Sequence, residues 1–371
     1  MSKVYNNISR FANKLKLYFS EVANYFLYKE HVYIQKSAHV FFNTYENSPP
    51  IPYTSYDLAD LCHFHNQIPP QNTKPFIIDY EHPLALSGHS TDYVYMINST
   101  KKIEEKLNSV KCKAISVPSE GALRETKKYL DITNINKKIH IIRPAYPTKP
   151  ENLHNHNGPF TILTIGNKFW AKGIPIAIEV FRVLREKYDK KVNMNLICGD
   201  VPNNYPLVDG ISLIKKTHLS DKQRSMLYSS CHMLLLPCLQ DSYAVYQEAM
   251  AFGVPIVATN IYDKNEFIIN NQTGYLVDVP ISLYDGKFGH DWESWSHFQE
   301  IVKDKFHSGA LSKMTNDLVE RTELLFNDID LVRDMAKAAQ KLHKEEFSIK
   351  VRNSKVKNLY RQILSDLGKL S

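Results

Sequence analysis

Glycine, cysteine and long apolar stretches are all scarce in this sequence. Only 13 of its 371 residues are glycine, and its five cysteines are scattered without any Cys-x-x-Cys pair. That cysteine pattern argues against a zinc site or a disulfide framework and favours a reducing compartment. No apolar run is long enough to cross a bilayer, and the N-terminus lacks the core of a secretory signal. We therefore expect a cytoplasmic protein.

What is present is the composition of an ordinary globular chain. Hydrophobic residues make up 43% and charged residues 23% of the sequence, and the length suits two domains with a core each. The formal net charge of +7 favours anionic ligands or surfaces, such as nucleotides or membranes. Acidic residues interrupt the basic ones along the expected helices, so a nucleic-acid partner is not expected. The sequence does not indicate an oligomeric state.

Residues 3–28 have the spacing of one amphipathic helix. Val4, Ile8, Phe11 and Leu15 recur at three- and four-residue steps, with lysine and arginine elsewhere on the surface. Two interpretations stay open. The helix packs on its own domain, or its basic and aromatic surface lies on an anionic membrane. The second would place the protein peripherally at the inner membrane face.

From residue 31 to residue 144, short apolar segments alternate with helical ones. The expected strands are HVYIQ, AHVFF, FIIDY, YVYMIN, AISVPS and IHIIRP, and the expected helices cover 101–107 and 120–130. The proline- and asparagine-rich stretch 144–159 is the clearest linker. Beyond it, strands and helices alternate regularly, which requires right-handed crossovers and a parallel sheet.

This rhythm predicts an α/β protein with two doubly wound, Rossmann-like domains facing a central cleft. The first domain covers residues 1–148 and the second covers 149–347. A C-terminal helix over 348–371 is expected to cross back onto the first domain.

The most organised segment is LLLPCLQDSYAVYQEAMAFGVPIVATN, residues 234–260. It predicts a buried strand, a loop, a helix of about two turns ended by Gly253 and Pro255, and a second buried strand. The loop lies beside a helix N-terminus at the carboxyl end of a strand, where open α/β sheets bind phosphate-containing ligands. Glu248 in this helix would repel phosphate but can accept hydrogen bonds from ribose hydroxyls. The alternative is an acidic residue favoured only by the helix dipole.

Four segments together resemble the C-terminal domain of the retaining nucleotide-sugar glycosyltransferases of family 4. They are TIGNKFWAKGIPIAIEVF, LICGDVP, LPCLQDSYAVYQEAMAFGVPIVATN and NNQTGYLV, in that order and spacing. The resemblance implies the GT-B fold and a metal-independent transfer, with retention, from a UDP- or GDP-linked sugar to a hydroxyl acceptor. That acceptor would be a glycan or a lipid-linked glycan, and no cofactor besides the donor substrate is implied.

The resemblance also implies roles in the loop before Glu248. Glu248 matches the second carboxylate of the family's paired acidic element, which binds the ribose. The first carboxylate position holds Gln240, with Asp241 next to it, and this group would grip the transferred sugar. A plain N-cap is the other interpretation of Asp241. Ser242 and Tyr243 complete the same donor-binding loop.

A second loop, GNKFWAKG, resembles the one that clamps the diphosphate. Lys172 matches the family's lysine, whereas Asn167 stands where an arginine is expected. Lys168 beside it is the candidate substitute, and Gly166 opens the loop. Two cations opposite a leaving diphosphate would stabilise the charge that grows during cleavage.

Two further positions complete the implied site. Thr217 and His218 correspond to the loop whose backbone meets the nucleotide base, and His82 to a histidine near the anomeric carbon. The candidate catalytic residues are therefore His82, Asp241 and Lys172. His63, His65 and Glu81 could join His82 in a metal site, but their spacing is a weak signal. No metal is expected.

Three departures from the family pattern keep other functions open. Gln240 and Asn167 replace charged residues, no glycine-rich loop occurs near the start, and Tyr262 and Asp263 stand where two glycines are usual. The N-terminal domain is therefore expected to be reduced or remodelled. A catalytically degenerate nucleotide-sugar-binding or scaffold protein is the main alternative. An epimerase or phosphorylase of the same architecture is another.

Overall fold

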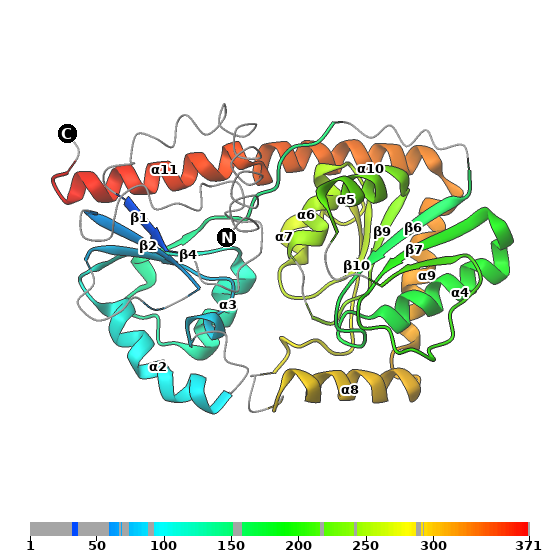
Figure 1. The fold of residues 1–371 in the computed structure, drawn as a ribbon, viewed down its shortest axis with the longest axis horizontal. Coiled ribbons are helices and arrows are strands. Elements are labelled where there is room, and N and C mark those ends of the chain that lie inside the picture. Colours follow the sequence, from blue (N-terminus) through cyan, green and yellow to red (C-terminus); the bar gives the residue numbers. More distant parts are fainter. Residues whose placement is uncertain are drawn as a thin grey trace, which may run out of the picture.

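Two parallel β-sheets flanked by helices lie side by side in the molecule (Figure 1). The computed structural model describes residues 32–35, 59–66, 68, 74–87, 93–150, 158–215, 219–240, 243–286, 291 and 293–369. The architecture confirms the predicted α/β class with two Rossmann-like domains. None of the helices in this described part is both long and apolar enough to span a membrane.

The first sheet has the strand order β1–β2–β3–β4–β5, and its strands pair in parallel. The strands are β1 (Val32–Gln35), β2 (Leu61–His65), β3 (Phe76–Asp79), β4 (Cys112–Val117) and β5 (Ile139–Ile141). The helices of this half are α2 (Tyr93–Asn108), α3 (Glu120–Tyr129) and the short 3₁₀ turns η2 (Pro83–Ser87) and η3 (Asn136–Lys138). Ser119 caps α3 by accepting a hydrogen bond from the Ala122 amide at 3.0 Å, as serine commonly does at an N-cap.

The prediction of a strand over YVYMIN, residues 93–98, is wrong, because these residues form the first part of α2. Aromatic and β-branched residues favour a strand locally. The segment nevertheless runs without a break into the helical stretch 101–107, where Ile103 and Leu107 are buried four residues apart. The packing of that helix overrides the local preference. The helix predicted over 3–28 and the strand AHVFF lie outside the described residues.

The second sheet has the order β11–β10–β9–β6–β7–β8. Its strands are β6 (Phe160–Ile165), β7 (Val192–Ile197), β8 (Ile211–Ile214), β9 (Met233–Leu236), β10 (Ile256–Thr259) and β11 (Gly274–Val277). Its helices are α4 (Ile174–Tyr188), α5 (Asp221–Ser230), α6 (Tyr243–Ala251), α7 (Lys264–Phe267), α8 (Trp295–His307), α9 (Ser312–Asn327) and α10 (Ile329–Leu342), with the 3₁₀ turn η4 (Asp189–Lys191). The strand order reverses between β6 and β9. In open α/β sheets, ligands bind at the carboxyl ends of the strands at such a switch point.

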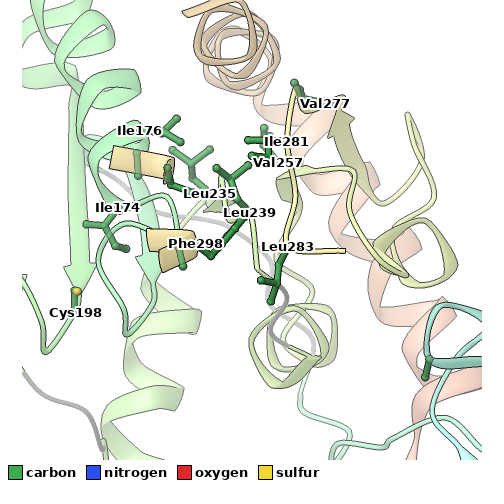
Figure 2. Close-up of a cluster of buried hydrophobic side chains, with 14 of the residues drawn as sticks. Ile174, Ile176, Cys198, Leu235, Leu239, Val257, Val277, Ile281, Leu283 and Phe298 are labelled. Atoms are coloured by element: carbon green, nitrogen blue, oxygen red, sulfur yellow. The ribbon is translucent and has the colours of Figure 1, made fainter. Parts of the chain in front are cut away.

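One apolar cluster runs from the first domain through the second. In the second domain, side chains from β9, β10 and β11, from α4 and α8 and from the loops between them contribute to it (Figure 2). The labelled members are Ile174, Ile176, Cys198, Leu235, Leu239, Val257, Val277, Ile281, Leu283 and Phe298. Because Leu239 and Leu283 belong to loops, this core fixes the loops as well as the sheet.

The last helix belongs to the first domain by its contacts. A π-helical turn, η5 (His343–Phe347), joins α10 to α11 (Ile349–Asp366), and α11 runs along the first sheet (Figure 1). Tyr360 and its apolar neighbours on α11 form one buried cluster with Leu61, Ile77 and Ala114 of β2, β3 and β4. The first domain therefore completes its core with residues from the far end of the sequence.

Candidate functional site

The loops after β6 and β9 meet at the switch point of the second sheet. The amides of Leu239 and Gln240 both donate to the carbonyl of Ala171, at 2.9 and 3.1 Å. Lys172 Nζ donates to the carbonyl of Gln240 at 3.1 Å. The structure therefore brings together the two loops that the sequence predicts for the donor.

Glycine is required where these loops touch. Gly173 has a φ of +66°, and a Cβ there would lie 1.9 Å from the carbonyl oxygen of Pro237. A Cβ at Gly166 would lie 2.7 Å from Cβ of Lys172. At Gly173 the new side chain would separate the two backbones, and at Gly166 it would displace Lys172 within the first loop. Gly173 is also the N-cap of α4, whose first amide groups therefore lie beside the junction of the loops.

The three polar candidates of the first loop point in different directions. Lys172 reaches the second loop, as described above. The Lys168 ammonium lies 4.5 Å from the ring centroid of Trp295 on α8, and burial lowers its pKa. The side-chain oxygen of Asn167 accepts from the Gly199 amide at 3.4 Å, beyond the end of β7. Of the three, Lys172 is the one that bridges the two loops.

Glu248 is buried on α6 and has a cationic partner that the sequence did not reveal. It is 4% exposed, and its Oε1 lies 3.2 Å from Nη1 of Arg224 on α5. Burial by itself would lower the pKa of Arg224. The charges of Glu248 and Asp221 raise it by more, so the pKa lies above its usual value. Burial, followed by the charge of Glu248, raises the pKa of Tyr228 on the same helix. No spacing rule links residues 224 and 248, so only the fold shows this pair.

The remaining candidates of the donor side are described only in part. The Oε1 atom of Gln240 is buried and has no hydrogen-bond partner among the described residues. Tyr243 begins α6, but its side chain is not described. Thr217, His218, Asp241 and Ser242 lie outside the described residues, so their predicted roles stay predictions.

His82 lies after the carboxyl end of β3, and both of its ring nitrogens have partners in the first domain. Nδ1 accepts from the Leu84 amide at 3.2 Å, and Nε2 lies 3.4 Å from Oε2 of Glu125. Since Nδ1 accepts from a backbone N–H, the ring proton belongs on Nε2. The other carboxylate oxygen of Glu125 pairs with Lys128 at 2.7 Å.

His63 and His65 share one face of β2 and pair with Asp79 of β3. Their nearest ring nitrogens lie 3.3 and 3.0 Å from the carboxylate oxygens, and His63 Nδ1 lies 2.5 Å from the Tyr360 hydroxyl. Burial by itself would raise the pKa of Asp79, but the charges and hydrogen bonds of His65 and His63 hold it well below its usual range. The described residues contain no group of three His, Cys, Asp or Glu side chains that could hold a metal.

Helix α7 of the second domain also contacts the N-terminus of α3 in the first domain. Glu266, on α7, accepts from the Glu120 and Gly121 amides at 3.0 and 2.9 Å and pairs with Arg143 at 3.2 Å. A carboxylate is favourable there because the N-terminus of α3 carries partial positive charge. The family resemblance matches Glu266 to a common acidic position but does not indicate its partners, which lie in the other domain.

Comparison with known proteins shows that part of the second domain is similar to a known group. Residues 146–283 match the model of the family described as glycosyl transferases group 1. A protein of Klebsiella pneumoniae, described as an uncharacterized 41.2 kDa protein in the cps region, is 25% identical over 166 residues. Those residues make up 43% of this chain and 45% of that protein. The match therefore spans less than half the length of that relative.

Solved structures of similar fold cover both domains. Sucrose-phosphate synthase from Thermosynechococcus elongatus has a TM-score of 0.58 at 13% identity, over 83% of this chain and 74% of its own. The pneumococcal O-GlcNAc transferase GtfA, in complex with UDP and GlcNAc, has a TM-score of 0.52 at 13% identity, over 81% of this chain and 56% of its own. At this level of identity the likeness concerns the fold, and it confirms the predicted GT-B architecture.

Proposed function

We propose that this protein is a retaining glycosyltransferase. It would transfer a sugar from a nucleoside diphosphate sugar to a hydroxyl of a glycan or lipid-linked glycan. The observation that carries the proposal is the junction of the two loops at the switch point, where Lys172 meets Gln240. This junction lies inside the segment that matches the group 1 glycosyl transferases, and a neighbour of the same fold holds UDP and GlcNAc.

Lys172 and the N-terminus of α4 would bind the diphosphate. The lysine ammonium contacts a backbone carbonyl, and a phosphate oxygen is a stronger partner for it. The amides at the start of α4 add partial positive charge at the same place. Charge that grows on the leaving diphosphate would therefore be stabilised by groups already in position.

Glu248 would accept hydrogen bonds from the ribose hydroxyls. Arg224 contacts Oε1, and a carboxylate can accept several hydrogen bonds at once. The arginine also offsets the negative charge of Glu248 beside an anionic donor. In this proposal, Arg224 reduces the repulsion between the buried Glu248 carboxylate and the diphosphate.

His82 would position the transferred sugar from the first domain. Its Nε2–H points at Glu125, and a sugar hydroxyl would take the place of that carboxylate when the donor binds. No protein nucleophile is proposed. The acceptor oxygen would attack from the face of the departing diphosphate, whose oxygen would take the acceptor proton, and the configuration would be retained. We propose no metal and no further cofactor.

A thermal-shift titration with the UDP, GDP, ADP and dTDP sugars tests this proposal. We expect one nucleotide to raise the melting temperature of the wild type, because a ligand that binds only the folded state stabilises it. Glu248→Gln should lose that shift, whereas Glu300→Gln, on the exposed side of α8, should keep it. NMR of the product formed with a glycan acceptor would report the anomeric configuration.

Three results would change the assignment. Inversion of the anomeric centre would remove the retaining mechanism. Tight nucleotide-sugar binding with neither hydrolysis nor transfer would support the degenerate binding protein, and Gln240 and Asn167 would then be the residues to restore. Binding by Glu248→Gln as tight as by the wild type would remove the ribose role of this residue.

A further inference from the structure

Tyr262, in the loop after β10, has an unusual backbone. Its φ is +58°, which is left-handed for a residue other than glycine. A bulky side chain in that region is strained and persists only where the surroundings hold it. Strained residues of this kind are found at functional sites more often than elsewhere. The contacts of Tyr262 show what the strained conformation achieves.

Tyr262 reaches from the second domain into the first. Its hydroxyl donates to the carbonyl of Glu81 at 3.2 Å, and its own carbonyl accepts from Arg124 of α3. Its ring stacks on Tyr284, with centroids 4.2 Å apart and an interplanar angle of 24°. The approach is close, since a Cβ at Gly121 would lie 3.0 Å from the Tyr262 carbonyl.

The hydroxyl of Tyr262 meets the turn that carries His82. Within the first domain, the Glu81 amide donates to Oδ1 of Asn66 at 3.0 Å. The backbone nitrogen of Glu81 is thus held by the first domain, and its carbonyl oxygen by the second. Tyr262 therefore contributes to the position of the residue that follows.

The stacked partner of Tyr262 reaches His82 by a second route. Lys128 donates to the carbonyl of Tyr284 and pairs with Glu125 at 2.7 Å. Glu125 in turn contacts the ring of His82 at 3.4 Å. The backbone beside His82 and the ring of His82 are consequently both connected to the same pair of tyrosines.

We propose that Tyr262 is a positioning residue for sugar transfer, which sets the Glu81–His82 turn from the opposite domain. The inference rests on the proposed function, because it concerns the histidine that would meet the sugar. Tyr262 itself touches neither donor nor acceptor in this scheme. Its left-handed backbone directs the ring toward the first domain. Without that ring, the Glu81–His82 turn would be held by the first domain alone.

The test compares Tyr262→Phe with Tyr188→Phe. Both remove one phenolic hydroxyl, but Tyr188 ends α4, on the side of the second domain away from the first (Figure 1). The readouts are hydrogen exchange of the peptide over 80–87, the rate of hydrolysis of the preferred nucleotide sugar, and its dissociation constant. Within this peptide, the Leu84 and Ala85 amides bond to the His82 ring and carbonyl, so their exchange reports on the turn.

We expect Tyr262→Phe to speed exchange in this peptide and to lower turnover about fivefold, as the loss of one hydrogen bond would. The dissociation constant of the donor should stay unchanged, and Tyr188→Phe should match the wild type throughout. Unchanged exchange in Tyr262→Phe would overturn the proposal, even if the wild type proved to bind no nucleotide sugar. Failure of the proposed function is thus seen separately, in the wild type alone.

Tyr262→Gly supplies a second test, because glycine adopts the left-handed backbone without strain. We expect turnover below that of Tyr262→Phe, because the ring is lost together with its hydroxyl. Relief of the left-handed strain offsets part of the lost packing on Tyr284, so the variant is expected to stay folded. Turnover equal to that of the wild type would overturn the positioning role.

Discussion

The two sheets share one architecture but bury different kinds of side chain. In the second sheet, β9 and β10 carry Leu234–Leu236 and Ile256–Ala258, all buried and apolar, and the polar candidates follow in the loops. In the first sheet, His63, His65 and Asp79 lie within the strands and are 3%, 3% and 7% exposed. The strands β2 and β3 of the first sheet therefore bury ionisable side chains where β9 and β10 of the second bury apolar ones.

The buried pairs of the first sheet depend on one strand register. His65 lies opposite Asp79 in the parallel pairing of β2 and β3, and Tyr360 approaches His63 from α11. A register shifted by one residue would move these side chains to the other face and leave buried charges unpaired. The polar network therefore selects a single arrangement, and it also makes this domain sensitive to acid.

The largest expected effect concerns the loop junction of the second domain. Gly173→Ala should lower the free energy of unfolding by about 4 kcal/mol or more, because the new Cβ meets a backbone carbonyl at a left-handed φ. Gly158→Ala is the matched control, since a Cβ there meets nothing within 4 Å. Urea unfolding of both variants measures the difference. Equal midpoints would mean that the two loops do not depend on their close approach.

Asp79→Asn should have the next largest effect, in the first domain. Removing one partner of a buried ion pair should lower the free energy of unfolding by about 3 kcal/mol at pH 7. The folded pKa of Asp79 lies below its usual value of 3.8, so its contribution is present above that value and is lost as the pH falls from about 5. Urea unfolding from pH 7 to pH 3 should show this acid-dependent loss in the wild type and a weaker one in the variant. The same pH dependence of the free energy of unfolding in both proteins would contradict this role of Asp79.

His343, at the connection between the domains, should act in a higher pH window. Burial lowers its pKa from 6.5 to about 4, so the neutral ring is favoured in the folded state. The contribution of the neutral His343 ring to stability is therefore fully present above pH 6.5 and is lost as the pH falls through about 4. The loss should be roughly 3 kcal/mol or less. His343→Met should remove this part of the pH dependence. Melting curves between pH 7 and pH 4 would measure it, and parallel curves for variant and wild type would contradict it.

The smallest expected effect concerns the contact between the domains. Glu266→Gln keeps the shape but removes the charge at the N-terminus of α3, and it should lower the free energy of unfolding by about 1 kcal/mol. Glu300→Gln removes an exposed charge, whose partner is Lys303 of the same helix at 3.5 Å, and should change little because an exposed pair of this kind contributes little. Urea unfolding in low and high salt would separate the two, since the loss at Glu266 should shrink as salt screens it. A variant as stable as the wild type in low salt would make this contact dispensable.

The second domain could be predicted from the sequence far better than the first. Apolar runs such as Leu234–Leu236 are typical of buried parallel strands, and Gly253 and Pro255 predict the end of the helix between them. In the first domain, LCHFH places two histidines in a buried strand, and YVYMIN has strand composition in a helix. Local patterns do not reveal partners such as Asp79 and Tyr360, which become visible only when the strands pair.

The same limit applies to the candidate site. Lys172 and Gln240 were singled out by the family resemblance, and Glu248 also by its place in a helix between two buried strands. The sequence did not reveal Arg224, nor the partners of Glu266 and Tyr262, because those partners lie far away in the sequence. Tyr262 gave one local signal, a tyrosine where glycines are usual, but its left-handed backbone and its contact with Glu81 required the fold.

The position of α11 has a consequence for synthesis on the ribosome. The hydroxyl of Tyr360 meets His63 across 297 positions of sequence, and α11 covers a face of the first sheet that is apolar in Leu61, Ile77 and Ala114. A ribosome that starts at the N-terminus completes these strands long before the helix that covers them. The domain made first is therefore finished last, and its uncovered face must be kept from aggregating while the second domain is made.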